Sequence, residues 1–294
     1  MTSNNKRRPR HERVDEAQRP PFRLNDRDAL ILKFINDCRA LTTQQVEMLF
    51  FKSAKPAYGR LHKLYHHEYV ERQFITQVVT APAASRVVYT IAPLGAAVLA
   101  QTYGYSPEDI HPASRQVRSW EKLQHLLAIN DVRLALTRAV WDTPDMSLKD
   151  WRDEFVFRSA PRYVTVTTAR GGDKRQPVYP DAYIHLATPR GEARFFLEVD
   201  LGTEGLEQVK GQIAIYQAYI LSGRYHEDFQ SRSLRILIVA PSPRRLENLV
   251  KAVESQGGGE RYWLTTREQI TPALLLTAPI WRKVGSDGLF PLIG

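Results

Sequence analysis

Carboxylates at the ends of two apolar segments are the residues of this sequence best suited to chemistry. Asp181 stands at the start of the apolar segment 180–186, and Glu198 and Asp200 lie within the next one, 194–203. Apolar runs of this length around a short polar turn predict a largely buried β-hairpin. Because side chains alternate along a strand, Glu198 and Asp200 are expected on one face. Buried carboxylates repel each other unless a cation or hydrogen bonds compensate them, which suggests Mg²⁺ or Mn²⁺.

The carboxylate pattern resembles the core of the PD-(D/E)xK nuclease-like superfamily, on the residues at 180–181 and 198–200. In active members of that superfamily, a lysine two residues after the glutamate helps to position and polarise the attacking water. This chain has Asp200 in that place. The resemblance implies that Lys210 or Gln212, on the following helix, would have to take over the role of the lysine.

Two interpretations of these acidic residues stay open. In the first, Asp181 and Glu198 are metal ligands, and the candidate catalytic residues are Asp181, Glu198, Asp200, Lys210 and Glu154. In the second, Asp181 caps a turn, and Glu198 and Asp200 pair with arginines. We favour a domain that does not cleave DNA. An acid in place of the lysine removes a catalytic cation and adds a charge that repels phosphate.

Composition limits the class of protein. The chain has 294 residues, of which 43% are hydrophobic and 25% charged, and this is typical of a globular protein long enough for two domains. Its net charge of +9 favours a polyanionic partner, duplex DNA before a membrane. The sequence has neither an apolar run of about 18 residues nor an apolar signal core, so we expect a cytoplasmic protein. The one cysteine, Cys38, is expected in the core.

Several enzyme classes are disfavoured by the motifs. The sequence contains no Ser-His-Asp pattern, no phosphate-binding P-loop and no GxGxxG after a predicted strand. Acyl transfer, ATP hydrolysis and dinucleotide-dependent chemistry each depend on one of these arrangements. Metal-dependent phosphodiester chemistry and DNA binding without chemistry are the functions that remain.

The N-terminal part is predicted to be a basic arm followed by a small helical domain. Residues 1–23 are polar and basic, which predicts a flexible arm. The domain spans 24–103. Its apolar periodicity predicts three helices, at 25–39, at 41–51 and from about 53. A strand pair at 69–79 and 86–91 and a closing helix at 93–102 are predicted to follow.

This order of elements resembles a winged helix-turn-helix domain. In such a domain the third helix fits the major groove and the hairpin lies along the phosphates. The candidate DNA-contacting residues are Lys55, Tyr58, Arg60 and Lys63 on the third helix, with Arg72 and Arg86 on the hairpin. The alternative is a module that docks another protein and whose charged face is only solvated. The basic arm, the basic helix and the overall charge favour DNA.

A linker at 104–118 is expected to lead into a second domain at 119–294. The predicted elements of that domain are a helix at 120–141, a strand at 150–157, the hairpin, a helix capped by Thr203, a strand at 234–240, a helix at 243–255 and a strand at 261–265. This αβββαβ order agrees with the nuclease-like fold. Lys174 and Arg175 lie in a polar connection, where they either contact a phosphate backbone or belong to a simple exposed loop.

Several stretches together resemble the replication-relaxation family of mobile-element proteins, over roughly residues 25–240. They are residues 41–45, 60–64, 125–133, 180–181 and 195–204. In that family the Glu-x-Asp form at 198–200 is usual. The resemblance implies a winged helix followed by a nuclease-like domain, in a plasmid or integrative-element protein that acts on DNA.

We therefore expect a DNA-binding protein that acts in replication, in mobilisation or relaxation, or in transcriptional control, with a nuclease-like domain that does not cleave. A metal-dependent endonuclease that nicks DNA is the first alternative, and a partner-docking module is the second. The expected partner is double-stranded DNA, with a second copy of the chain or a replication or relaxase protein as a further partner.

Overall fold

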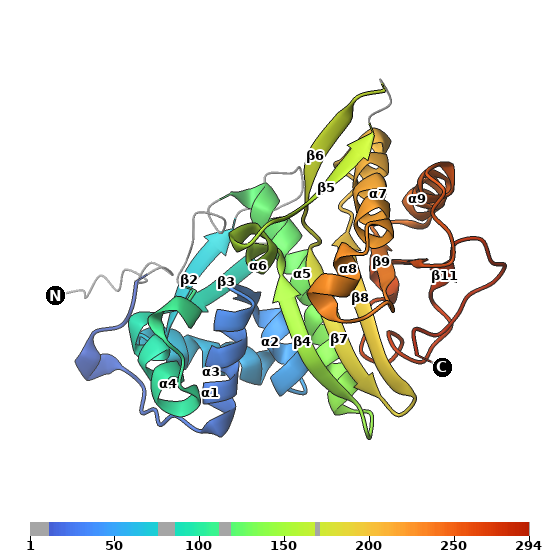
Figure 1. Ribbon diagram of the computed structural model, residues 1–294. Helices are drawn as coiled ribbons and strands as arrows, with labels where there is room; N and C mark the ends of the chain where they lie inside the picture. The colour runs from blue at the N-terminus through green and yellow to red at the C-terminus, as the bar shows by residue number, and fades with distance from the viewer. Residues whose placement is uncertain (1–11, 76–85, 112–118, 168–170, 294) are drawn as a thin grey trace. The chain divides into compact units, whose positions relative to one another are not determined.

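The computed structural model describes residues 12–75, 86–111, 119–167 and 171–293. The chain is a mixed α+β protein with two compact units, Met1–Asn130 and Asp131–Gly294 (Figure 1). The division falls inside helix α5, Trp120–Trp141. The predicted linker at 104–118 is described only as far as residue 111. Within the described residues, no helix combines the length and the apolar character needed to cross a membrane.

The N-terminal unit has the three helices, strand pair and closing helix that the sequence predicts, and in addition a short strand, β1, where the second helix was predicted to begin. Its strands form one antiparallel sheet in the order β1-β3-β2. Residues 76–85, which include the predicted tip of the β2–β3 hairpin, lie outside the described residues. The elements are α1 (Asp26–Asp37), β1 (Leu41–Thr42), α2 (Thr43–Phe50), α3 (Ala54–His66), β2 (Val70–Ile75), β3 (Arg86–Ile91) and α4 (Pro93–Tyr103).

Local capping sets where the helices of this unit begin. Asn25 and Asp28 form a reciprocal capping box at the start of α1, and Thr42 and Gln45 form another at the start of α2. Fully buried side chains from α1 and α3, together with the buried thiol of Cys38, fill the core between the helices. The prediction of a core cysteine is therefore confirmed.

The first half of α5 packs on the N-terminal unit. Leu123 and Leu127 join a buried cluster with Ala40 and Val88. The Asn130 amide donates hydrogen bonds to two backbone carbonyls of the loop after α1, at 3.0 and 2.9 Å. These contacts satisfy a buried polar side chain in the middle of an apolar helix.

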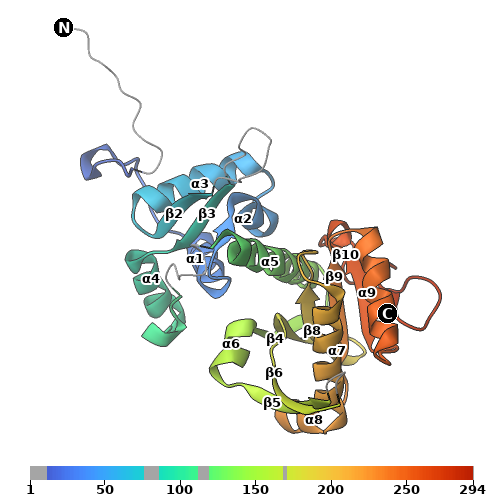
Figure 2. The same ribbon diagram turned by 90° about the horizontal axis from the view of Figure 1, so that it is seen from above.

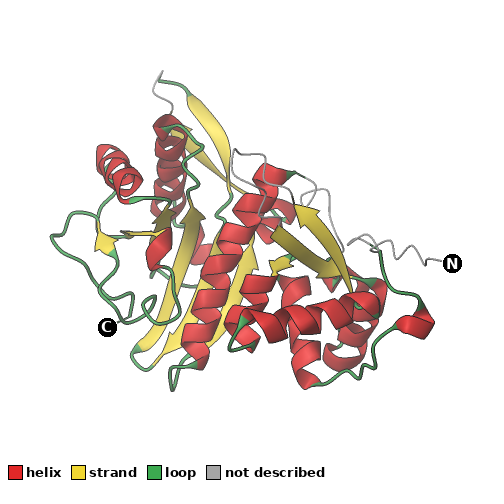
Figure 3. Cartoon of the chain, turned by 180° about the vertical axis from the view of Figure 1, so that it is seen from behind, coloured by secondary structure: helices red, strands yellow, loops and turns green. Residues whose placement is uncertain are grey.

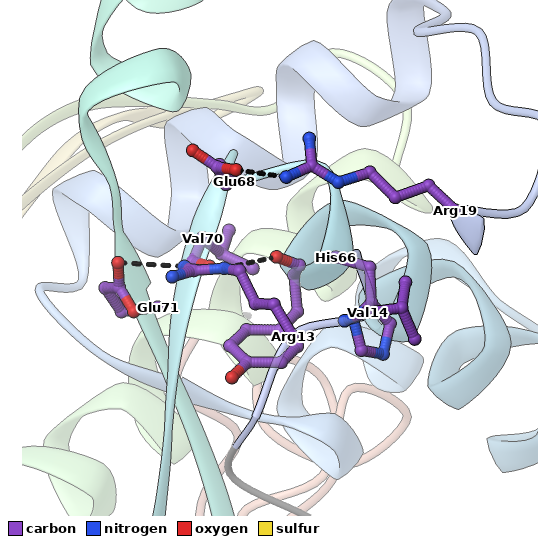
Figure 4. Close-up of polar contacts among 8 residues, drawn as sticks. Arg13, Val14, Arg19, His66, Glu68, Val70 and Glu71 are labelled. Carbon is purple, nitrogen blue, oxygen red and sulfur yellow. Dashed lines mark hydrogen bonds and ion pairs between the residues drawn. The ribbon is translucent and has the colours of Figure 1, made fainter. Parts of the chain in front are cut away.

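Residues 12–23, expected to belong to a flexible arm, are instead held against the end of α3 and the start of β2 (Figure 4). Arg13 donates from Nε to the carbonyl of Tyr65 at 2.9 Å and pairs through Nη2 with Glu71 at 2.8 Å. Arg19 pairs with Glu68. For residues 12–23 the expectation was wrong, because Arg13 and Arg19 pair with carboxylates 58 and 49 residues away in the sequence. Residues 1–11 of the predicted arm lie outside the described residues.

The C-terminal unit is built on a six-stranded sheet with the order β11-β10-β9-β8-β7-β4. Strands β8, β9 and β10 are parallel, and β4, β7 and β11 run antiparallel to their neighbours. The strands are β4 (Ser147–Asp153), β7 (Ala182–Thr188), β8 (Gly191–Val199), β9 (Arg235–Ala240), β10 (Tyr262–Thr266) and β11 (Arg282–Lys283). Helices α6 (Glu154–Ser159), α7 (Leu206–Leu221), α8 (Arg224–Phe229) and α9 (Pro243–Ser255) connect them.

Helices cover both faces of this sheet. On one face, Phe196 of β8 and Ile236 and Ile238 of β9 belong to a buried cluster with residues of α7 and α9. Side chains alternate along a strand, so their neighbours, such as Leu197 and Leu237, point to the other face. Figure 3 shows α5 crossing the sheet on the side seen from behind.

The predicted hairpin is present. Strands β7 and β8 pair in antiparallel register from Ala182 opposite Leu197 to Thr188 opposite Gly191, with a two-residue turn. The order α5, β4, β7, β8, α7, β9 matches the predicted helix, three strands, helix and strand.

Three local predictions in this unit were wrong. The strand predicted at 150–157 ends at Asp153, because the Asp153 carboxylate accepts hydrogen bonds from the amides of Phe155 and Val156 and so caps α6. Thr203 does not cap α7, which begins at Leu206 after Gly205. The polar connection with Lys174 and Arg175 is not a loop but strand β6 (Asp173–Val178), paired with β5 (Arg162–Thr167).

Candidate nucleic-acid surface and acidic site

The outward face of α3 carries a cation, an aromatic ring and a glycine. Lys55, Tyr58, Gly59 and His62 share one side of the helix, because they are three, four and seven residues apart. Lys55 is exposed, and Tyr58 is 51% exposed. Helix α3 contains no carboxylate. The face therefore combines positive charge with a flat apolar side chain, as expected of a surface that contacts nucleic acid.

Gly59 is not required by packing in this unit. A Cβ atom added there would meet no atom of the described residues within 4 Å. Glycine in the middle of a helix costs about 0.5–1 kcal/mol relative to alanine. Gly59 and His62 are not among the predicted DNA-contacting residues, although their spacing from Lys55 places them on the same side of the helix.

Arg60 lies on another side of α3 and contacts α1. Its Nε is 2.6 Å from Oδ1 of the fully buried Asp28, and its Nη2 pairs with the second oxygen of that carboxylate. Nη2 also donates to the carbonyl of Arg23 at 2.8 Å, and the guanidinium lies 4.4 Å from the ring centre of Phe22. The predicted DNA-contacting residue Arg60 is therefore engaged inside the unit.

The other predicted cations differ in their environment. Lys63 is half-buried on α3. The guanidinium of Arg72 on β2 lies 4.0 Å from the ring centre of Tyr65 and 5.2 Å from that of Phe74. Arg86 begins β3, and its side chain lies outside the described part.

Two histidines at the end of α3 form a short polar chain. The Nε2 atoms of His62 and His66 are 3.0 Å apart, and Nδ1 of His66 accepts a hydrogen bond from the Val14 amide at 3.0 Å. A neutral imidazole that accepts at Nδ1 carries its proton on Nε2. His66 therefore donates to His62 and is unavailable as a metal ligand while the N-terminal segment is bound.

In the C-terminal unit, Asp181 and Glu198 lie together at the ends of β7 and β8. Oδ2 of the buried Asp181 accepts a hydrogen bond from the Val199 amide at 2.7 Å. Its backbone carbonyl accepts from the Glu154 amide at 3.1 Å, which brings the start of α6 to the same place. The prediction that both carboxylates lie at one end of the hairpin thus agrees with the geometry.

Glu198 is held by Tyr216 of α7, which donates its hydroxyl to Oε1 of the carboxylate. Burial raises the pKa of Glu198 well above its usual value, and the negative charges of Asp181, Glu204 and Glu154 raise it further. The Tyr216 hydrogen bond acts in the opposite direction. The pKa of Tyr216 is also raised, first by burial and then by Glu198. The surroundings of Glu198 therefore destabilise its ionised form.

Asp200 belongs to a separate ion pair. Arg245, in the first turn of α9, binds both of its oxygens, at 2.6 Å through Nε and 3.2 Å through Nη2. The Gly202 amide donates to Oδ1 at 3.0 Å. Asp200 therefore shares its strand face with Glu198 but is neutralised by an arginine, as the second interpretation of the acidic residues expected for this position.

The remaining predicted site residues have local partners. Glu154 pairs with Arg158 one turn later on α6. Lys210 pairs with Glu207 on α7 at 2.7 Å, and the Glu207 side chain is 86% exposed. Gln212 lies one turn before Tyr216 on α7, and its interaction with the Tyr216 hydroxyl partly offsets the raised pKa of that tyrosine. Tyr216 and Arg245 were missed by sequence reasoning, because neither stands near a motif.

Asp181 and Glu198 are the two carboxylates at this site that would face a bound cation. Among the described residues, no three His, Cys, Asp or Glu side chains are arranged to hold a metal ion. Mg²⁺ commonly binds proteins through one or two carboxylates and retains several waters. Asp181 and Glu198 would supply those carboxylates, and a cation would offset the charge repulsion that adds to burial in raising the pKa of Glu198.

The fold and these sites define a mixed α+β protein with a basic helical unit and a sheet that carries buried carboxylates. The chain matches the model of the replication-relaxation family over residues 32–230. It therefore belongs to the replication-relaxation family. No curated protein matches it.

A structural comparison finds the restriction endonuclease FokI, with a TM-score of 0.29 and 10% sequence identity. The similarity covers 83% of this chain and 43% of FokI, so this chain spans less than half of the length of that protein.

Proposed function

We propose that this chain is a DNA-binding protein of a plasmid or integrative element, acting in its replication, mobilisation or relaxation. In this proposal the N-terminal unit is a winged helix that contacts duplex DNA through α3. The C-terminal unit is a nuclease-like scaffold that does not cleave. The observation that carries the proposal is the outward face of α3, where Lys55 and Tyr58 are exposed on a helix without carboxylates.

The order of elements supports the winged-helix assignment. Helices α1, α2 and α3 precede the hairpin β2–β3, and the short strand β1 pairs with β3 to complete a three-stranded sheet. In winged helix-turn-helix domains the corresponding third helix enters the major groove. Membership of the replication-relaxation family supports the role in a mobile element.

The first test is the double variant Lys55→Ala with Tyr58→Ala. We expect affinity for a random-sequence 30-base-pair duplex to fall about 10-fold to 100-fold, because a phosphate contact and an aromatic contact are lost together. The slope of log Kd against log salt should decrease by about 1. Fluorescence anisotropy at several salt concentrations measures both. Unchanged affinity and slope would contradict the proposal.

A second test uses Gly59→Ala. This variant should stabilise the unit by up to about 1 kcal/mol and at the same time weaken DNA binding, since the methyl group would stand between α3 and the groove. Gly211→Ala is the matched control, because Gly211 is an exposed glycine of α7 whose Cβ would also meet no atom within 4 Å. Urea unfolding and anisotropy are measured for both variants. Equal DNA affinity of the two would contradict a close approach at Gly59.

Metal-dependent nicking is the second candidate function. It is favoured by one observation, the pairing of the buried Asp181 with the half-buried Glu198, whose pKa is raised. A bound Mg²⁺ would supply an activated water, Asp181 and Glu198 would hold the ion, and Tyr216 would fix the orientation of Glu198. The ion pair with Arg245 removes one argument against catalysis, because Asp200 is neutralised and no longer repels phosphate. Asp200 nevertheless occupies the position of the lysine of active PD-(D/E)xK nucleases, so that position supplies no cation for catalysis.

Supercoiled plasmid incubated with Mg²⁺ or Mn²⁺ separates the two candidates. A catalytic site would convert it to the nicked form, and Glu198→Ala would abolish this while Glu207→Ala, which changes an exposed carboxylate, would not. Intact plasmid with the parent protein supports the scaffold.

A further inference from the structure

The imidazole ring of His62 is a polar group on the outward face of α3 to which the proposed function gives no role. His62 shares that face with Lys55, Tyr58 and Gly59, and it is half-buried. Figure 2 shows α3 along one edge of the N-terminal unit, where the helix packs on α2 and β2. The centres of the Tyr58 and His62 rings are 6.0 Å apart. His62 therefore belongs to the same surface as Lys55 and Tyr58.

Hydrogen bonds within the unit fix the tautomer of His62. The Val14 amide can only donate, so Nδ1 of His66, which is 3.0 Å away, accepts and carries no proton (Figure 4). His66 then carries its proton on Nε2, 3.0 Å from Nε2 of His62. Only one proton fits between these two atoms, so Nε2 of His62 is an acceptor. The proton of a neutral His62 ring therefore lies on Nδ1.

The N-terminal segment holds the first donor of this chain of hydrogen bonds in place. Arg13, next to Val14, donates from Nε to a backbone carbonyl at the end of α3 at 2.9 Å. Further along the segment, the Pro20 carbonyl accepts a hydrogen bond from Nε2 of His67 at 2.9 Å. His66 is 3% exposed, so water does not readily replace the Val14 amide as its donor.

The Nδ1 atom of His62 is available to a ligand. In the part of the chain that the structure describes, this atom has no hydrogen-bond partner. The two nitrogens of an imidazole point in different directions, so Nδ1 does not face His66. Burial lowers the pKa of His62, and the positive charge of Arg72 lowers it further. The surroundings therefore favour the same neutral ring that the hydrogen bonds require.

We propose that His62 contacts duplex DNA as a neutral hydrogen-bond donor through Nδ1, and that His66 is the positioning residue that fixes this tautomer. The acceptor is an exposed lone pair of the duplex, either N7 of a purine in the major groove or an oxygen of a phosphate. A neutral donor releases no counterion when it binds, so its effect on affinity differs in kind from that of Lys55. The inference rests on the proposed DNA-binding function.

The binding test uses His62→Ala in the full chain and a labelled random-sequence duplex. Affinity should fall about 2-fold to 10-fold, the usual effect of losing one neutral hydrogen bond. The slope of log Kd against log salt should stay that of the parent, because no charge is removed. His62→Asn should keep most of the affinity, since its amide N–H groups can take the place of Nδ1–H. His226→Ala, which removes an exposed histidine of α8, should bind like the parent.

A duplex in which 7-deazapurines replace the purines identifies the acceptor. If His62 binds N7, the parent and His62→Ala should bind this duplex equally well, because the acceptor is missing. If His62 binds a phosphate oxygen, the loss in His62→Ala should be the same as on the unmodified duplex.

The tautomer is tested directly in the protein without DNA. With ¹⁵N-labelled histidine, long-range proton–nitrogen spectra of the full chain distinguish protonated from bare ring nitrogens. His62 should carry its proton on Nδ1 and His66 on Nε2. His66→Gln keeps an amide donor for His62 and should keep both the tautomer and the DNA affinity. His66→Leu removes the donor, so it should release the tautomer and weaken DNA binding although His62 is still present.

The outcomes separate this inference from the proposed function. Parent binding that is weakened by Lys55→Ala/Tyr58→Ala but not by His62→Ala overturns the role of His62 and leaves the function standing. A salt slope that decreases in His62→Ala, or a His62 ring protonated on Nε2 in the free protein, also overturns the neutral donor. A parent without salt-dependent binding overturns the proposed function itself. Urea unfolding of each variant separates loss of a contact from loss of structure.

Discussion

Arg60→Ala is expected to destabilise the N-terminal unit by about 3–5 kcal/mol, the usual cost of leaving a buried charge without its partner. Asp28 is fully buried, and the Arg60 side chain is 18% exposed, so water cannot replace the arginine effectively. The same carboxylate accepts the Asn25 amide in the capping box of α1 at 2.9 Å. Loss of Arg60 therefore disturbs both the contact between α1 and α3 and the start of α1.

The measurement is the urea dependence of amide hydrogen exchange in α1 and α3, which isolates this unit from the rest of the chain. Lys55→Ala is the control, an exposed cation of the same helix whose removal should change stability by at most about 0.5 kcal/mol. The double variant Asp28→Ala/Arg60→Ala should be less destabilised than the sum of the single variants, because no buried charge remains. If Arg60→Ala behaves like Lys55→Ala, the ion pair is not structural.

The structural role of Arg60 also matters for DNA-binding experiments. A loss of affinity in an Arg60 variant would follow from loss of structure, whether or not the arginine touches DNA. Lys55 and Tyr58 are the better probes, because both side chains are exposed and, among the described residues, neither forms an ion pair like that of Arg60 with Asp28.

Glu198→Gln is expected to stabilise the C-terminal unit at neutral and alkaline pH. The raised pKa means that the folded state prefers a protonated Glu198, whereas an unfolded glutamate ionises near its usual value of 4.5. The stability that the protonated side chain contributes is complete below pH 4.5 and is lost as pH rises through the folded pKa. Glutamine has the same shape, can accept from Tyr216 and carries no charge, so the variant avoids this loss. Each unit of pKa displacement corresponds to about 1.4 kcal/mol.

Urea unfolding of the parent and the variant between pH 4 and pH 9, followed by exchange of β8 amides, measures the effect. The difference should be near zero at the acidic end and should increase with pH until it levels off. Glu207→Gln, which changes an exposed carboxylate of α7, should show no such increase. A variant less stable than the parent at pH 8 would show that the charge of Glu198 is compensated inside the protein.

Comparison of the parent with Glu198→Gln also tests whether this site binds a metal ion. Mg²⁺ that binds the folded parent should raise its stability by mass action, by about 2.7 kcal/mol at a concentration 100 times Kd. Glu198→Gln should respond much less, because it lacks one of the two carboxylates. Equal responses would place any binding elsewhere on the chain.

The sequence alone determined the hairpin β7–β8, the three helices, strand pair and closing helix of the N-terminal unit, the core order α5, β4, β7, β8, α7, β9 of the C-terminal unit, and the convergence of Asp181 with Glu198. Each of these follows from local rules: apolar periodicity distinguishes helices from strands, and the two-residue period of a strand assigns side chains to faces. The family, too, was indicated by short stretches such as 198–204, and the match over residues 32–230 confirms it.

Tertiary structure alone decided which charged residues have partners. Arg60 meets Asp28 across 32 residues of chain, and Arg245 meets Asp200 across 45. No local pattern encodes these pairs, so an arginine at the edge of a helical face looks the same whether it is solvated or paired. Strand β6 was missed for a related reason. Its sequence is polar, and it is a strand because β5 supplies hydrogen bonds and α7 covers Val178. Side-chain partners and the pairing of polar strands depend on contacts between distant segments, and only the folded chain brings those segments together.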